Sequence, residues 1–254
     1  GVGIPVLACD FIDTDAGILL TSENGLIGYG WHAPEGDEDL DVVSPGMQYV
    51  LLPPGAAIVH HADAFGLIRS GRVDCSVLGA YEVAPDGSFA NWTRSDDGRT
   101  DLGGIGGALD LTQEVKHVYL TMFHTTPDGI PRLVEQCTLP VTGGRAASLI
   151  VTDLAVIMVN ELGFELIEHA PNYLIEEIQA VTAAPLALCF LLYHFSPVLP
   201  SGLPVTRAWC TPAFSLLELA WEFHLRFISL SLSLCPETDF SCPETDFSCP
   251  ETDF

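Results

Sequence analysis

The fold is decided by the stretch Gly17-Ile18-Leu19-Leu20-Thr21-Ser22-Glu23-Asn24-Gly25-Leu26-Ile27-Gly28. Its short apolar run, from Ile18 to Leu20, predicts a buried strand. The strand is followed by Ser-Glu-Asn-Gly, whose residues favour turns and accept unusual backbone angles. One carboxylate, Glu23, is therefore expected where a strand ends. In open α/β sheets the carboxyl ends of the strands border the ligand crevice.

A glutamate in this position has two interpretations. An isolated Ser-Glu-Asn-Gly is best explained as a surface turn. A glutamate at a strand end can instead act as a nucleophile toward an activated acyl group, provided that water is excluded and backbone N–H groups hold the oxyanion. The choice between the two depends on the rest of the chain.

The composition is that of a globular and strongly acidic protein. The chain has 254 residues, of which 48% are hydrophobic, enough for one good core and at most a small appendage. It carries 9 Lys and Arg against 34 Asp and Glu, a net charge of −25. Such a chain cannot assemble the basic patch that nucleic acid or an anionic membrane surface requires, so neither is an expected partner.

No metal site is expected. The eight cysteines include no Cys-x-x-Cys pair and no zinc-like Cys/His spacing. Cys9, Cys75 and Cys137 lie in apolar or strand-like surroundings and are expected to be buried free thiols. Free thiols fit a reducing compartment. The acidic run from Glu35 to Asp41 is better explained as a solvated charged loop than as a metal cage.

The hydrophobic pattern predicts alternating helices and strands. Helices are expected over residues 4–12, 64–69 and 173–181, with a short one after residues 105–108. Strands are expected over residues 48–52, 73–83 (a central strand) and 115–122, with a final hairpin formed by residues 149–159 and 164–167. Loops are expected over residues 29–41 and 95–104. This alternation is typical of an α/β fold.

Five further residues, at three places in the chain, are considered as candidates for a site. Gly106 and Gly107 form a turn at the start of a helix, where unpaired backbone N–H groups can hold an anion, although a Gly-Gly pair alone is weak evidence. His124 ends a predicted strand and is a possible base, but a structural role is the favoured interpretation. His60 and His61 are adjacent, so they point in different directions and do not favour a shared metal, although one of them could face the crevice at Glu23.

The chain changes character after Pro185. Residues 186–234 are apolar but aperiodic, and their apolar runs are too short or too interrupted for a membrane span. Residues 235–254 repeat Cys-Pro-Glu-Thr-Asp-Phe three times, and the proline in each repeat excludes a coiled coil. We expect a folded domain over residues 1–186 and an extraneous, largely unordered tail over residues 187–254. A metal-binding role for the repeats is the less favoured alternative.

The part of the chain that we expect to fold contains a series of short motifs. They are Gly3-Ile4-Pro5, Ser22-Glu23-Asn24-Gly25, Leu52-Pro53-Pro54-Gly55-Ala56, Ala64-Phe65-Gly66-Leu67-Ile68-Arg69, Val77-Leu78-Gly79-Ala80, Ala90-Asn91-Trp92, Gly106-Gly107-Ala108-Leu109-Asp110-Leu111, His124-Thr125, Cys137-Thr138-Leu139-Pro140-Val141-Thr142-Gly143 and Thr152-Asp153-Leu154-Ala155-Val156. Together they resemble the B subunits of the 3-oxoacid CoA-transferases, the family of succinyl-CoA:3-ketoacid and 3-oxoadipate CoA-transferases. The resemblance implies a three-layer α/β open sheet with helices on both faces.

The resemblance also implies a site and a reaction. The implied site consists of Glu23 as nucleophile, the N–H groups of Gly107 and Gly106 as oxyanion donors, and Ser22, Asn24 and Gly25 around the turn and the substrate. CoA would be a substrate, moved from an acyl-CoA such as succinyl-CoA to acetoacetate or 3-oxoadipate through a glutamyl-CoA thioester. No cofactor would be bound permanently.

A partner follows from the same resemblance. The family pairs a B subunit with an A subunit, and this chain has too few cations to hold most of the phosphates of CoA, so the A subunit should supply those contacts. The implied compartment is the cytoplasm, or the mitochondrial matrix in a eukaryote. Gly1 matches a position inside the family's first strand, so the natural start is expected upstream.

Departures from the family pattern leave two other functions open. Thr21 stands where His or Gln is usual, Phe123 where an acidic residue is usual, and Leu149 where Arg is usual. The run Gly28–Pro34 replaces a Gly-Pro-aromatic-Pro run. A catalytically impaired assembly subunit would share the fold and lack the activity. An acyl-CoA hydrolase of the same fold would keep Glu23 and let water complete the reaction.

Overall fold

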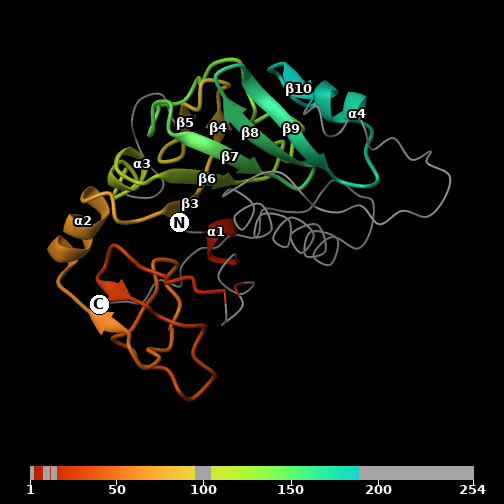
Figure 1. Cartoon of the computed structure of the whole chain (residues 1–254). Coiled ribbons are helices and arrows are strands. Elements are labelled where there is room, and N and C mark those ends of the chain that lie inside the picture. The colour runs from red at the N-terminus through yellow and green to blue at the C-terminus, as the bar shows by residue number, and fades with distance from the viewer. Residues whose placement is uncertain (1–2, 8–11, 13–15, 95–103, 189–254) are drawn as a thin grey trace, which may run out of the picture.

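The computed structural model describes residues 3–7, 12, 16–94 and 104–188 (Figure 1). Its elements, in chain order, are α1 (Ile4–Leu7), β1 (Leu26–Ile27), β2 (Ala57–Ile58), α2 (His61–Arg69), β3 (Cys75–Gly79), β4 (Glu82–Val83), β5 (Phe89–Ala90), α3 (Asp110–Gln113), β6 (His117–Thr121), β7 (Ala147–Val151), β8 (Ala155–Asn160), β9 (Gly163–His169), α4 (Ile175–Ala180) and β10 (Leu186–Leu188). Cys9 and the tail over residues 189–254 lie outside the described residues.

A six-stranded mixed sheet forms the centre of the fold. Its strand order is β10-β9-β8-β7-β6-β3. Strands β3, β6 and β7 run parallel to one another, as do β9 and β10, whereas β7–β8 and β8–β9 are antiparallel. Parallel neighbours need a crossover connection, and β3 reaches β6 through the β4–β5 hairpin and α3.

Apolar side chains pack on both faces of this sheet. On one face, Leu120, Ile150 and Leu166 join a large buried cluster that also includes Ile178 of α4. On the other face, Leu149, Val151 and Val156 are packed against Ile4 of α1. Successive strand residues point to opposite faces, so the alternation along β7 supplies both layers. The predicted three-layer α/β sheet with helices on both faces is confirmed.

A separate segment precedes the sheet. Residues 16–58 form the short antiparallel ribbon β1–β2 and long loops, with a small buried cluster of Leu26, Tyr29, Val42 and Val50. Figure 1 shows this segment in red and orange, beside the six-stranded sheet and leading into α2. The part of the fold that carries Glu23 is therefore outside the main sheet.

Two predicted strands in this segment are wrong. Ile18 and Leu19 are exposed, at 41% and 66%, and belong to no strand. Residues 48–52 make only isolated bridges, at Tyr49 and Val50. Glu23 consequently lies in a turn that precedes strand β1, and not at the carboxyl end of a buried sheet strand. An apolar run predicts that its side chains are covered in the assembled protein, but it does not show that they are covered within a strand of this chain.

Most other predicted elements agree with the structure. The predicted helices at residues 64–69 and 173–181 correspond to α2 and α4, and the strand at 115–122 corresponds to β6. The predicted final hairpin corresponds to the antiparallel pair β8–β9, but its first strand was predicted too long, because the chain turns at residues 152–154 and forms both β7 and β8. The central strand predicted over residues 73–83 is wrong, since β3 ends at Gly79 and lies at one end of the strand order. Among the described residues, every helix is too short or too polar to cross a bilayer.

His124 is part of the core. Its side chain is fully buried, with Nδ1 3.0 Å from Thr152 Oγ1 and Nε2 2.8 Å from Thr182 Oγ1. Burial lowers the pKa of His124 to about 4. A neutral ring with both nitrogens occupied by threonine hydroxyls has a structural role, in agreement with the favoured interpretation of the sequence.

We expect this histidine to make the fold acid-sensitive. Between about pH 6.5 and pH 4 the unfolded chain binds a proton at His124 that the folded chain does not, so the free energy of unfolding falls as pH is lowered, by about 1.4 kcal/mol per unit at most. Urea unfolding at pH 7 and pH 5 should show a smaller loss for His124→Gln than for the natural chain, although the variant is less stable at pH 7.

The exposed His117 provides the control. His117→Gln should keep the natural pH slope. Burial raises the pKa of Glu168 to about 7 and also raises that of Asp153, and these carboxyl groups act in the opposite direction. The natural chain and both variants contain these carboxyl groups. The difference between their pH slopes of unfolding free energy therefore reports on His124. Equal slopes for His124→Gln and the natural chain would contradict the assignment.

Candidate active site

The Ser-Glu-Asn-Gly stretch forms a tight turn. The Ser22 N–H donates to the Leu26 carbonyl oxygen at 2.9 Å, and the Gly25 N–H donates to the Ser22 carbonyl oxygen at 3.1 Å. The buried Ser22 hydroxyl also accepts a hydrogen bond from the Leu26 N–H at 3.2 Å. These bonds hold Glu23 at the tip of the turn, as the sequence predicted.

Gly25 connects the turn to the chain that enters α2. Its φ of 111° lies in the region that favours glycine. The Val59 N–H donates to the Gly25 carbonyl oxygen at 2.9 Å, and a Cβ added at Gly25 would overlap the Val59 carbonyl oxygen. Any other residue at this position would push the two chain segments apart.

Asn24 connects the same turn to a neighbouring loop. Its Nδ2 donates to the Val43 carbonyl oxygen at 2.7 Å, and its Oδ1 accepts a short hydrogen bond from the Ser22 hydroxyl. Ser22 and Asn24, on either side of Glu23, thus form their side-chain hydrogen bonds within this chain. Their contacts fit the predicted shaping of the turn.

The Glu23 side chain lies against Gly107. A Cβ added at Gly107 would overlap Glu23 Oε2 and would approach Cζ of Phe65 to 2.9 Å. Glu23 itself is half-buried. Residues far apart in the sequence are therefore brought into contact: the turn carboxylate, the backbone of the Gly-Gly turn and an aromatic ring of α2.

One backbone donor of the Gly-Gly turn makes no hydrogen bond to another described residue. Leu111 N–H donates to the Gly107 carbonyl oxygen at 3.1 Å, but within the part of the chain that the structure describes the N–H of Gly107 makes no hydrogen bond. Gly106 has a φ of 55°, and a Cβ built on it would have no described neighbour within 4 Å. Of the two glycines, Gly107 contacts Glu23 and Gly106 borders open space.

An ion pair fixes the Gly-Gly turn to α2. Arg69 Nε donates to Asp110 Oδ1 at 2.6 Å, and the Arg69 guanidinium lies 5.5 Å from the centre of the Phe65 ring. In the sequence, Arg69 indicates only a helix end, and Phe65 and Asp110 indicate no function by themselves. The four-residue spacing of Phe65 and Arg69, which puts them on one side of a helix, is the available signal.

The described cysteines do not compete as nucleophiles. Cys75 and Cys137 are free and half-buried. Burial, assisted by Asp74, raises the pKa of the Cys75 thiol to about 12. Burial, assisted by Glu82 and Asp86, raises the pKa of the Cys137 thiol to about 11. The thiolate is the reactive form of cysteine, so both side chains are inert near neutral pH.

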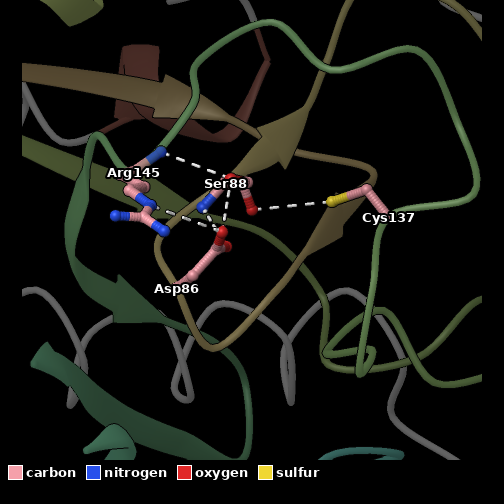
Figure 2. A network of polar contacts seen from close by, with 4 residues as sticks. All are labelled: Asp86, Ser88, Cys137 and Arg145. Atoms are coloured by element: carbon pink, nitrogen blue, oxygen red, sulfur yellow. Dashed lines mark hydrogen bonds and ion pairs between the residues drawn. The ribbon is translucent and has the colours of Figure 1, made fainter. Parts of the chain in front are cut away.

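Figure 2 shows that Cys137 belongs to a structural network at the β4–β5 hairpin. Its Sγ lies 3.5 Å from the Ser88 carbonyl oxygen, and the Ser88 N–H and hydroxyl donate to Asp86 at 2.9 and 3.1 Å. The Arg145 N–H donates to the Ser88 hydroxyl at 3.3 Å. The network anchors the segment after Cys137 to the hairpin.

The residues around Glu23 fit the chemistry of a carboxylate nucleophile. Among the residues that the structure describes, no three His, Cys, Asp or Glu side chains are grouped to hold a metal ion. A partly buried carboxylate beside a free backbone N–H and an aromatic ring has the elements needed for attack on an acyl carbon.

Comparison with known proteins identifies relatives over the described part of the chain. The sequence profile of the coenzyme A transferase family matches residues 1–180. The chain is 39% identical over 186 residues to the B subunit of the 3-oxoadipate CoA-transferase of Pseudomonas putida, covering 73% of this chain and 86% of that protein. It is 33% identical over 184 residues to the B subunit of the succinyl-CoA:3-ketoacid coenzyme A transferase of Helicobacter pylori, covering 72% and 87%.

Solved structures share the fold at lower identity. The apoenzyme of an acyl-CoA transferase from Escherichia coli O157:H7 aligns with a TM-score of 0.56 and 20% identity, over 74% of this chain and 38% of that one. The AibA/AibB decarboxylase aligns with a TM-score of 0.52 and 22% identity, over 74% and 76%. The profile match and the sequence identities agree with the motifs around Glu23: the chain belongs to the coenzyme A transferase family and is related to the B subunits of its 3-oxoacid members.

Proposed function

We propose that this chain is the B subunit of a CoA-transferase that uses Glu23 as its nucleophile. The observation that carries the proposal is the contact of the Glu23 carboxylate with Gly107, whose N–H is unpaired in the described structure. A carboxylate next to a free donor can attack an acyl carbon while the donor receives the oxyanion that develops.

The proposed reaction proceeds in balanced steps. A Glu23 oxygen attacks the thioester carbon of an acyl-CoA, the C–S bond breaks, and an acyl-glutamyl anhydride and CoA thiolate result. The thiolate then attacks the glutamyl carbonyl carbon, which releases the first acid and leaves a glutamyl-CoA thioester. A second carboxylate then attacks the glutamyl-CoA thioester. The same steps in reverse convert this acid into a new acyl-CoA and regenerate the Glu23 carboxylate. The thioester bond energy is conserved in this covalent exchange.

The surroundings of Glu23 favour this chemistry over simple solvation. A carboxylate in water is a poor nucleophile toward thioesters, so orientation and exclusion of water must supply most of the acceleration. The turn hydrogen bonds fix the backbone of Glu23, and Phe65 presents an apolar ring at Gly107. Gly107 would donate to the oxyanion, with Gly106 next to it facing the open side.

We further propose that the substrates are a CoA thioester such as succinyl-CoA and a 3-oxo acid, acetoacetate or 3-oxoadipate. The names of the Pseudomonas putida and Helicobacter pylori relatives support this substrate class. CoA is then a substrate and not a resident cofactor. A site in the cytoplasm, or in the mitochondrial matrix of a eukaryote, fits these substrates.

An A-type subunit is the proposed partner. Nine of the seventeen large hydrophobic side chains that are exposed in the described residues lie in the segment that carries Glu23: Ile18, Leu19, Trp31, Leu40, Met47, Tyr49, Leu51, Leu52 and Ile58. Concentrated apolar exposure marks a protein interaction surface. Residues 16–58 also contain six carboxylates and no Lys or Arg. A partner that covers this segment and supplies cations would complete a site for polyanionic CoA.

Replacing the carboxylate should abolish transfer. In a complex with an A-type subunit, Glu23→Gln should lower the transfer rate on the order of 10³-fold or more, because the amide cannot form the anhydride. Incubation of the natural complex with acyl-CoA followed by borohydride or hydroxylamine should modify residue 23, as read by peptide mass spectrometry. Glu161→Gln, at an exposed position in the β8–β9 turn and outside residues 16–58, is the matched control and should retain transfer.

Two outcomes would select the alternative functions. Release of CoA from acyl-CoA without any acid acceptor would identify a hydrolase. Absence of both turnover and trapping, in a complex that assembles normally, would identify an inactive assembly subunit. Transfer by the purified single chain would contradict the need for an A-type partner.

Adding one methyl group at Gly107 should disable the site. The Cβ of Gly107→Ala would collide with Glu23 and Phe65, so the carboxylate must move away from the N–H donor. We expect a loss of transfer of about 10²-fold or more with little change in unfolding. Gly66→Ala is the control: it lies on α2 with no atom within 4 Å of an added Cβ, and should retain activity. Equal activity of both variants would contradict the oxyanion role.

Charges introduced on the apolar segment should weaken assembly. Met47 and Ile58 are 78% and 64% exposed, so glutamate at either position should leave the isolated chain folded. Buried in an interface between subunits, an unpaired carboxylate should raise the Kd for the A-type subunit by about tenfold or more. Leu162→Glu, at a 91% exposed position in the β8–β9 turn, should leave the Kd measured by calorimetry unchanged. Unchanged Kd values in all three variants would exclude this surface.

A further inference from the structure

Helix α2 connects the Glu23 turn with the Gly-Gly turn. At its entrance, the chain is hydrogen-bonded to the Gly25 carbonyl oxygen, within the Glu23 turn. At its last residue, Arg69 Nε donates to Asp110 Oδ1 at 2.6 Å. Asp110 lies three residues after Gly107. The position of this one helix therefore affects how the carboxylate and the Gly-Gly turn lie relative to each other.

Hydrogen bonds cap α2 at both ends. His60 Nδ1 accepts from the Ala62 N–H at 3.2 Å, and Ser70 Oγ donates to the Leu67 carbonyl oxygen at 2.7 Å. Such bonds occupy backbone groups that a helix end otherwise leaves without partners. The helix is thus a well-defined link between the two turns.

Phe65 carries the position of α2 to Gly107. Its Cζ and Cε1 atoms lie 2.9 and 3.0 Å from the point that a Cβ on Gly107 would occupy, and Glu23 Oε2 lies against the same point. The Arg69 guanidinium lies 5.5 Å from the centre of the Phe65 ring, within the range of a cation–π contact. A displaced Arg69 side chain would therefore release the ring from a contact next to the site.

Helix α3, which follows Gly107, is too short to fix its own position. It has four residues, fewer than a helix needs to be stable by itself. Polar side-chain contacts attach it on two sides: Ser76 Oγ of β3 donates to the Leu111 carbonyl oxygen at 2.7 Å, and Asp110 accepts from Arg69. The first contact attaches α3 to the sheet. The ion pair attaches it to α2.

The exposure of the ion pair argues against a role in stability. The Arg69 side chain is 61% exposed and the Asp110 side chain 26% exposed. Exposed ion pairs contribute little to the free energy of unfolding. In contrast, a displacement of reacting groups by about 1 Å can lower a reaction rate about 100-fold. The pair can thus matter for the geometry of the site while hardly affecting stability.

We propose that Arg69 and Asp110 are positioning residues, whose ion pair holds Phe65 and the Gly107 N–H against the Glu23 carboxylate. Both act through Gly107 and not by contact with the substrate. The assignment rests on the proposed transferase function and identifies residues that determine its rate.

Kinetics of the complex with an A-type subunit test this role. Arg69→Met and Asp110→Asn should each lower kcat about tenfold at unchanged KM, because the donor acts on charge that develops in the transition state. The double variant should be no slower than either single variant, since both remove the same contact. Arg69→Lys should recover part of the rate, because its ammonium group can pair with Asp110. Lys116→Met, which breaks an exposed ion pair with Asp74, is the matched control and should keep the natural kcat.

Four kinetic results would overturn the proposal. The first is a natural kcat in Arg69→Met. The second is an equal loss in Lys116→Met, which would indicate a general effect of removing a surface cation. The third is a raised KM at unchanged kcat, which would indicate that Arg69 binds the substrate directly. The fourth is losses that multiply in the double variant, which would show that Arg69 and Asp110 act separately.

Nuclear magnetic resonance gives a readout that needs neither turnover nor a partner. In a chain whose glycines are labelled at the carbonyl carbon and the nitrogen, carbonyl-filtered amide signals come only from the second residue of each Gly-Gly pair. The sequence has three such pairs, which end at Gly104, Gly107 and Gly144. Gly107→Ala identifies the Gly107 signal by removing it. Glu23→Gln should shift this signal in the natural chain, and about half as far or less in an Arg69→Met chain.

The two readouts separate this proposal from the transferase function. Equal shifts of the Gly107 signal in the natural and Arg69→Met chains would overturn the positioning role, whatever the activity. Absence of a shift in the natural chain would also overturn it, because Glu23 would not contact Gly107. Full transfer activity in Glu23→Gln, together with a reduced shift in Arg69→Met, would refute the transferase function and retain the positioning of Gly107.

Discussion

The site depends on the absence of a side chain at residue 107. The Glu23 carboxylate and the Phe65 ring occupy the volume that a Cβ there would fill. Gly25 imposes a similar condition on the other side of the site, where the turn touches the backbone of Val59. Two glycines thus allow three separate parts of the chain to meet: the turn, the entrance to α2 and the start of α3. Every proposed role of Glu23 depends on the close contact between these three parts of the chain.

The local features of this arrangement could be predicted from the sequence. Ser-Glu-Asn-Gly predicts a turn because its short polar side chains can bind the backbone and its glycine accepts a positive φ, and the structure shows both. The Gly-Gly turn before α3 follows from the same reasoning. Their contact in space could not be derived from spacing, because more than eighty residues separate them. The resemblance to the family predicted that Glu23 and Gly107 belong to one site. Their chemical roles in that site are a proposal.

Errors in the prediction share a physical cause. The apolar run at Ile18 and Leu19 predicted a buried strand, but apolar residues that serve a partner surface have the same composition as residues that serve a core. The turn between β7 and β8 was missed because it is made by Thr152, whose hydroxyl accepts from Leu154 and Ala155 N–H groups, and not by Gly or Pro. Phe65 and Arg69 share one side of α2, a pattern visible in the sequence, but only the structure shows that this side packs against Gly107 and Asp110.

The segment around Glu23 and the sheet have very different amounts of buried structure. Four side chains form the small cluster of the β1–β2 segment, whereas sixteen form the main cluster on the sheet. Regions with few buried contacts open locally at a lower free-energy cost than the global transition. We therefore expect the β1–β2 segment, with its smaller buried cluster, to lose order more easily than the sheet. If the A-type subunit covers residues 16–58 as proposed, its binding would stabilise the weaker part of the chain, and loss of the partner would inactivate the protein before the sheet unfolds.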